Sequence, residues 1–78
     1  MRVTIAKVDE NLFDGEAVSM TVPGSAGEMT ILSHHEPLIT TLKAGTIVLR
    51  ETRDSTPQTF PIESGVLEVN GEGATVIL

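Results

Sequence analysis

The sequence contains no cysteine, no tryptophan and no tyrosine, and its only phenylalanines are Phe13 and Phe60. The lack of cysteine excludes disulfide scaffolds, thiolate zinc sites and cysteine nucleophiles, and it is compatible with a reducing compartment. The shortage of aromatic rings removes the stacking platforms on which single-stranded nucleic acids and sugars usually bind. We therefore expect neither of these ligands.

Positive charge is also scarce, because 5 Lys and Arg residues stand against 11 Asp and Glu residues, for a formal net charge of −6. The basic residues are scattered, which disfavours nucleic acid and anionic membranes as partners. No segment approaches the run of about 18 apolar residues that a membrane span needs, and the first eight residues alternate and carry charge. We expect no signal peptide and no direct insertion into lipid.

The length of 78 residues allows one domain, which we assign to residues 1–78. Apolar and polar residues alternate in short segments, with turn residues about every eight to twelve positions. These segments are residues 2–5, 16–22, 28–32, 38–42, 46–52, 59–62, 65–69 and 74–78. The pattern predicts an all-β fold, a small flattened β-sandwich or barrel of eight or nine short strands.

The turns follow from residues that accept unusual backbone conformations. Asp14-Gly15 and Asn70-Gly71 are pairs typical of hairpin turns, and we predict a turn at each. We predict a longer loop at residues 33–37. The spacing of Ser33 and Glu36 resembles a helix capping box, but Pro37 disfavours the helical conformation of the residue before it, so we predict no helix there.

No residue pattern points to catalysis, a metal or a cofactor. His34, His35 and Glu36 are potential metal ligands, but adjacent residues of an extended segment point to opposite sides and no third His or Cys exists. The glycines of residues 23–27 lack the Lys and Ser/Thr of a phosphate-binding loop, and the acid Glu28 follows them. The serines have no nucleophile-elbow context. We therefore expect no catalytic residue.

Five segments together resemble one known family. They are LFDGEA (12–17), VPGSAGEMTIL (22–32), HEPLITTLKAG (35–45), FPIESGVLEV (60–69) and ATVIL (74–78). In order and spacing, these segments resemble the amino-terminal β-sandwich domain of the epsilon subunit of F-type rotary ATP synthases, which is called delta in mitochondria.

The resemblance implies a flattened barrel of about ten strands that couples the gamma subunit of the rotor to the membrane c-ring during proton-driven ATP synthesis. It implies a non-catalytic subunit without cofactor, in a peripheral complex on the cytoplasmic face of the bacterial inner membrane. An organelle matrix or stroma is the alternative location. Matched residue by residue, it assigns c-ring contacts to Glu28 and His35, and gamma contacts to Lys7, Ile39, Thr40 and Leu42.

The residues alone support these contacts in part, and without the resemblance Glu28 is best explained as a solvated acid in a turn. Glu28 closes a tight turn and His35 lies in the loop after the next strand, so we expect both at one end of the barrel. For Ile39 and Leu42, packing in the core remains an alternative to contact with gamma. Most family members continue into a helical hairpin that can bind ATP and brake hydrolysis. The resemblance does not reach such a hairpin, and we expect none of its activities.

Two other functions remain as alternatives. The first is a lipoyl- or biotinyl-carrier domain, which is also about eighty residues long, acidic and modified on a hairpin lysine. Leu42-Lys43-Ala44 approaches the Asp-Lys-Ala of lipoyl domains but lacks the preceding acid. The second is a generic small adaptor barrel with another partner.

Overall fold

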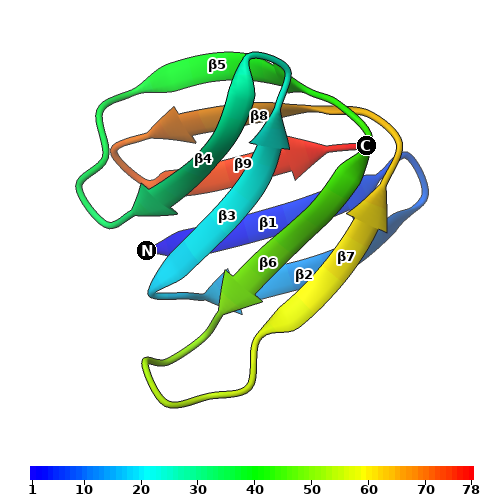
Figure 1. Cartoon of the computed structure of the whole chain (residues 1–78). Coiled ribbons are helices and arrows are strands. Elements are labelled where there is room, and N and C mark those ends of the chain that lie inside the picture. The colour runs from blue at the N-terminus through cyan, green and yellow to red at the C-terminus, as the bar shows by residue number, and fades with distance from the viewer.

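The computed structural model describes all 78 residues and contains nine β-strands and no helix (Figure 1). The strands are β1 (Arg2–Lys7), β2 (Glu10–Glu16), β3 (Ser19–Gly24), β4 (Gly27–Leu32), β5 (Leu38–Leu42), β6 (Gly45–Arg50), β7 (Gln58–Ile62), β8 (Gly65–Asn70) and β9 (Gly73–Ile77). The all-β prediction is confirmed, and the loop expected at residues 33–37 lies between β4 and β5. None of the protein's segments is a helix that could cross a membrane.

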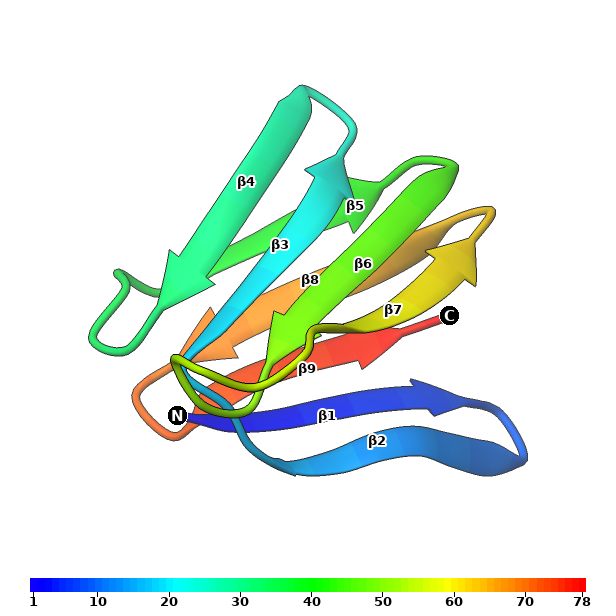
Figure 2. The same cartoon turned by 60° about the horizontal axis from the view of Figure 1, so that its bottom comes forward.

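The strands form one strongly curled sheet that folds into two layers (Figure 2). The five-stranded layer runs in the order β2-β1-β9-β8-β5, and the four-stranded layer in the order β7-β6-β3-β4. A single residue pair, Gly24 with Leu42, joins β3 to β5 and so connects the layers. All neighbours are antiparallel except β1 and β9, which are parallel.

The core lies between the layers and is entirely apolar. Side chains of a strand alternate between its two faces, so every second residue can point inward. In β3 the buried side chains are Met20 and Val22, and in β1 they are Val3 and Ile5. Fourteen apolar residues form this core, and no polar or charged residue is buried with them.

The two ends of the curled sheet meet through aromatic side chains instead of backbone hydrogen bonds. Phe13 of β2 and Phe60 of β7 lie with their ring centroids 6.5 Å apart and their planes at 68°. This edge-to-face geometry is a favoured arrangement of aromatic pairs. The only two benzyl side chains of the protein therefore help to close the sandwich between strands that do not pair.

The turn predicted at Asp14-Gly15 is wrong, because both residues lie inside β2. Asp14 is paired with Thr4 across β1, and its carboxylate accepts a hydrogen bond from Arg2 Nη2 at 2.6 Å. Gly15 has no positive φ. The chain reverses instead at residues 8–9, between β1 and β2, and bends at residue 18 before β3. Pairing with β1 holds the Asp-Gly pair in an extended conformation.

The turn predicted at Asn70-Gly71 is confirmed between β8 and β9. The side-chain Oδ1 of Asn70 accepts a hydrogen bond from the backbone N–H of Glu72 at 2.8 Å. The turn ends at Gly73, whose φ of +146° is unfavourable for any residue with a Cβ. A Cβ at this position would also lie 2.0 Å from the carbonyl oxygen of Arg2. Glycine at 73 is thus required for β9 to pair with β1.

We predict that Gly73→Ala destabilises the protein by about 2 to 3 kcal/mol, because it adds both backbone strain and a clash with β1. Gly71→Ala is the matched control: Gly71 lies in the same turn, has no positive φ and has open space around its Cα. Its effect should stay within about 0.5 kcal/mol. Chemical denaturation measures both free energies of unfolding. Equal stability of the two variants would contradict this account of the β1–β9 pairing.

Candidate protein-binding surface

An exposed apolar area lies on the outer side of the five-stranded layer. Val66 of β8, Ile77 of β9 and Ala6 of β1 are directly opposite one another in register. Ile39 of β5 is the diagonal neighbour of Val66, because Thr41 is the residue paired with Val66. We call these four residues the apolar face. Ile39 is 73% exposed, Ile77 52% and Val66 43%.

The apolar face follows from an excess of apolar residues in the strands. Leu67, Val69 and Val76 point into the core, so the alternation of the strands turns Val66 and Ile77 outward. A contiguous apolar area rimmed by polar residues is the usual mark of a surface that contacts another protein. The arrangement can therefore bury apolar area against a partner.

The structure separates the four residues assigned to gamma. Ile39 is on the apolar face, but Leu42 is only 3% exposed and belongs to the core. Its burial favours the alternative that Leu42 packs in the core over contact of its side chain with gamma. Thr40 lies on the inward side of β5 opposite Leu67 and is partly buried. The exposed Lys7 ends β1, beside a shallow cleft of about 310 Å³ lined by residues 61–64 and Leu78.

The expectation that Glu28 and His35 share one end of the barrel is wrong (Figure 1). Glu28 is exposed at the start of β4, opposite Pro23 and beside the tight turn. His35 lies beyond Leu32, where β4 ends. A turn before a strand and a loop after it lie at opposite ends of that strand. The four steps from Glu28 to Leu32 alone span about 13 Å.

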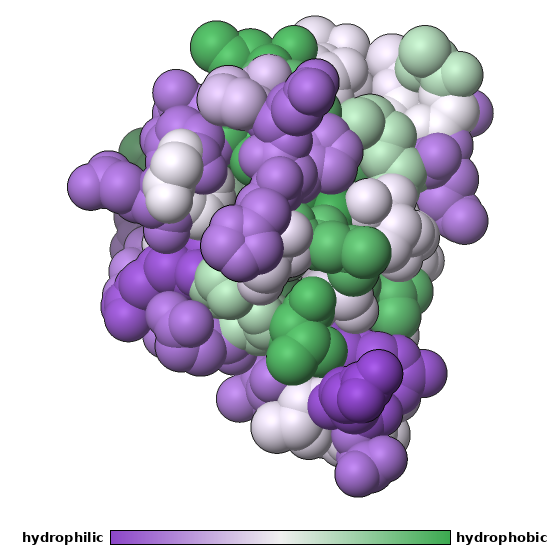
Figure 3. Space-filling model, turned by 90° about the vertical axis from the view of Figure 1, so that its left-hand side faces the viewer, coloured by the Kyte–Doolittle hydropathy of each residue, from purple (hydrophilic) through white to green (hydrophobic).

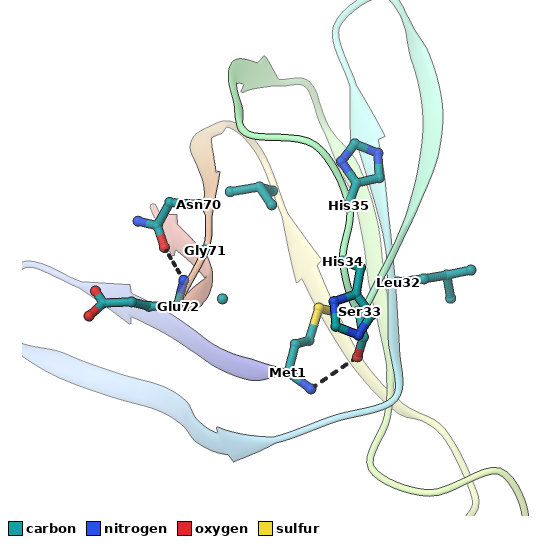
Figure 4. Close-up of a pocket in the computed structure, with 10 residues that line it drawn as sticks. Met1, Leu32, Ser33, His34, His35, Asn70, Gly71 and Glu72 are labelled. Atoms are coloured by element: carbon teal, nitrogen blue, oxygen red, sulfur yellow. Dashed lines mark hydrogen bonds between the residues drawn. The ribbon is translucent and has the colours of Figure 1, made fainter.

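His34 and His35 line a second cleft of about 310 Å³, between the loop after β4 and the β8–β9 turn (Figure 4). His34 has a φ of +68°, and Nδ1 of His35 lies 2.8 Å from the carbonyl oxygen of Glu36. The carboxylate of Glu72 points away from both imidazole rings in Figure 4. No three His, Cys, Asp or Glu side chains converge anywhere in the protein to hold a metal ion.

Figure 3 shows the side of the molecule that carries this cleft, where polar residues surround apolar areas. The structure thus assembles no set of ionisable groups around a reacting atom. Its most distinctive outward feature is the apolar face of the five-stranded layer.

Sequence reasoning did not identify Val66 and Ile77 as surface residues. A signal for them is present in the sequence, because Val66-Leu67 and Val76-Ile77 are adjacent apolar pairs in segments with strand alternation. One member of such a pair must point outward. Which outward residues lie side by side depends on strand pairing, and the sequence pattern does not contain that information.

Comparison with known proteins finds relatives over the whole chain. Residues 1–78 match the family described as ATP synthase, Delta/Epsilon chain, beta-sandwich domain. Over 77 residues, the chain is 35% identical to the ATP synthase epsilon chain of Herminiimonas arsenicoxydans and to ATP synthase epsilon chain 2 of Burkholderia orbicola. These matches cover 99% of this chain but 55% and 51% of the two relatives. The chain thus spans about half the length of the curated relatives it matches.

Solved structures share the fold. A chain of the Euglena gracilis mitochondrial ATP synthase, in a structure of OSCP, F1 and c-ring, superposes with a TM-score of 0.86 at 23% identity. The superposition covers 96% of this chain and 48% of the Euglena gracilis chain. A chain from the central stalk and c-ring of the Tetrahymena thermophila enzyme superposes with a TM-score of 0.78 at 17% identity, covering 99% and 61%.

The match of the family over residues 1–78 agrees with the five sequence segments that resembled it and with the nine-stranded sandwich. This chain belongs to the ATP synthase delta/epsilon family and comprises its β-sandwich domain.

Proposed function

We propose that this chain works as a non-catalytic part of the central stalk of an F-type ATP synthase. In this role it connects the gamma subunit to the membrane c-ring and transmits rotation during proton-driven ATP synthesis. Its place is in a peripheral complex on the cytoplasmic face of a bacterial inner membrane. The catalytic chemistry belongs to other subunits, and this chain carries no cofactor.

The observation that carries the proposal is the family match across residues 1–78. The curated relatives are bacterial ATP synthase epsilon chains. The geometry supports the same conclusion, because the molecule combines a well-packed core with an exposed apolar face. A coupling subunit needs such contact surfaces and needs no reactive centre.

We assign the gamma contact to the apolar face. Ile39 provides its most exposed side chain, while Thr40 lies on the inward side of β5 and Lys7 at the end of β1. Leu42 supports this surface from the core beneath β5. The proposed c-ring contact is Glu28, which projects beside the β3–β4 turn. His35 is a second candidate for the c-ring, but it lies at the other end of β4 and would need a separate contact.

The family match disfavours the two alternative functions, since it covers the whole chain. For a carrier domain, Lys43 would be the modified residue. Its backbone N–H donates a hydrogen bond to the carbonyl oxygen of Pro23, at the junction of the two layers. A generic adaptor barrel predicts no preference for ATP synthase subunits.

The test of the proposed function is reconstitution. The purified protein is added to ATP synthase particles from which the epsilon subunit has been removed, and proton-driven ATP synthesis is measured. We expect restored binding of gamma and c-ring and restored coupling. If the protein neither binds gamma nor associates with the particles, the proposed function is incorrect.

We predict that Ile39→Ser and Leu42→Ala have different effects. Ile39→Ser should weaken gamma binding by about 1 to 2 kcal/mol without loss of stability, because its side chain is 73% exposed. Leu42→Ala should lower the free energy of unfolding by about 2 to 5 kcal/mol, because it leaves a cavity in the core. Titration with gamma and chemical denaturation measure the two quantities. An unchanged stability of Leu42→Ala would contradict its placement in the core.

We predict that Glu28→Lys weakens assembly on the c-ring by about 1 to 3 kcal/mol, more at low salt than at high salt, because a rim charge acts through screened electrostatics. Binding of gamma and the free energy of unfolding should not change. Association with c-rings is measured at several salt concentrations, and His35→Ala is compared in the same series. If His35→Ala weakens association with c-rings and Glu28→Lys does not, the c-ring contact lies at the other end of β4.

A further inference from the structure

We propose that Glu68, on β8 at the outer side of the five-stranded layer, is the residue that sets the register of the partner on the apolar face. It does so by pairing with a basic side chain of the gamma subunit. This inference rests on the proposed function. It specifies which kind of side chain the gamma subunit places against the apolar face.

Glu68 lies among the residues of the apolar face. On β8 it is two residues from Val66, so the two side chains point to the same outer side. Ile39 of β5 is directly opposite it on one side, and Thr75 of β9 on the other. Side chains in such cross-strand pairs lie about 5 Å apart at their Cβ atoms.

No cation in the protein pairs with Glu68. The only ion pairs are those of the Met1 amino group with Glu16 and of Arg2 with Asp14. Arg2 is on the same outer side of the layer, but its guanidinium is already held by Asp14 at 2.6 Å. No hydrogen bond connects the carboxylate of Glu68 to another group. Glu68 is exposed, and its carboxylate has no partner within the chain.

Docking changes the surroundings of this carboxylate. A partner that packs on Ile39 and Val66 must also remove water from Glu68, since it lies between the strands' apolar residues. An ionised carboxylate that loses water without gaining a donor is strongly unfavourable. A Lys or Arg on the partner restores the lost interactions by a charge-assisted hydrogen bond. Charge complementarity therefore identifies the occupant as a segment with one basic residue among apolar ones.

The experiment measures the affinity of the gamma subunit for the protein and for Glu68→Gln between low and high salt. We expect Glu68→Gln to bind about tenfold more weakly at low salt, since a charge-assisted hydrogen bond is replaced by a neutral one. Its affinity should also depend less on salt than that of the wild type, because one screened ion pair is gone. Asp54→Asn is the matched control, since it removes one exposed negative charge in the loop between β6 and β7.

The outcomes separate this proposal from the proposed function. Weaker gamma binding by Val66→Ser would show that the apolar face binds gamma. If Glu68→Gln then has the same gamma affinity and the same salt dependence as Asp54→Asn, the proposed role of Glu68 is overturned. If the wild type does not bind gamma, the proposed function itself fails. A concentration-dependent dimer of the wild type that Val66→Ser abolishes would assign the face to a second copy and also overturn the proposal. Chemical denaturation of each variant verifies that the fold is intact.

Discussion

The packing of aliphatic side chains between two layers of one curled sheet is the interaction on which the molecule depends. Fourteen apolar residues meet there, and the core contains no ion pair and no buried polar group that could help to specify it. Because each strand alternates its side chains, filling this core also determines what every strand presents to solvent. The packing of the inward side chains thus also determines which side chains of each strand point outward.

Long-range contacts close the sandwich at a few places. Gly73 admits the parallel pairing of β1 with β9, which links the first and the last strand of the chain. The pair of Gly24 with Leu42 passes the sheet from one layer to the other. Phe13 and Phe60 bring the two outer strands of the sheet together. Each of these contacts joins segments that are distant in sequence. The nearest pair, Gly24 and Leu42, is 18 positions apart.

The surface properties fit the proposed coupling role. The apolar face lies across four strands of a hydrogen-bonded layer, so its side chains are held by a rigid support. Glu28 projects at a hairpin end, away from the middle of that layer. The proposed role in the central stalk requires separate contacts of this kind, one for each of two partners. We therefore regard the sheet as a spacer whose stiffness comes from its core and whose specificity comes from its outer residues.

The sequence by itself determined the local features of this protein. Alternation placed most of the strands, Pro37 excluded a helix in the loop after β4, and Asn70-Gly71 marked the turn between β8 and β9. These features depend on neighbouring residues, whose conformational preferences are readable along the chain. The five segments shared with the ATP synthase family were readable in the same way.

Only the tertiary structure decided how distant residues are combined. Pairing with β1 extended Asp14-Gly15, which prefers a turn when considered alone. The direction of β4 separated Glu28 from His35, and the two sides of β5 divided Leu42 from Ile39. The register of β5 with β8 brought Ile39 and Glu68 beside one another. The physical reason is that strand pairing is set by the burial of the whole core, and a shift of one residue would turn every side chain to the opposite face.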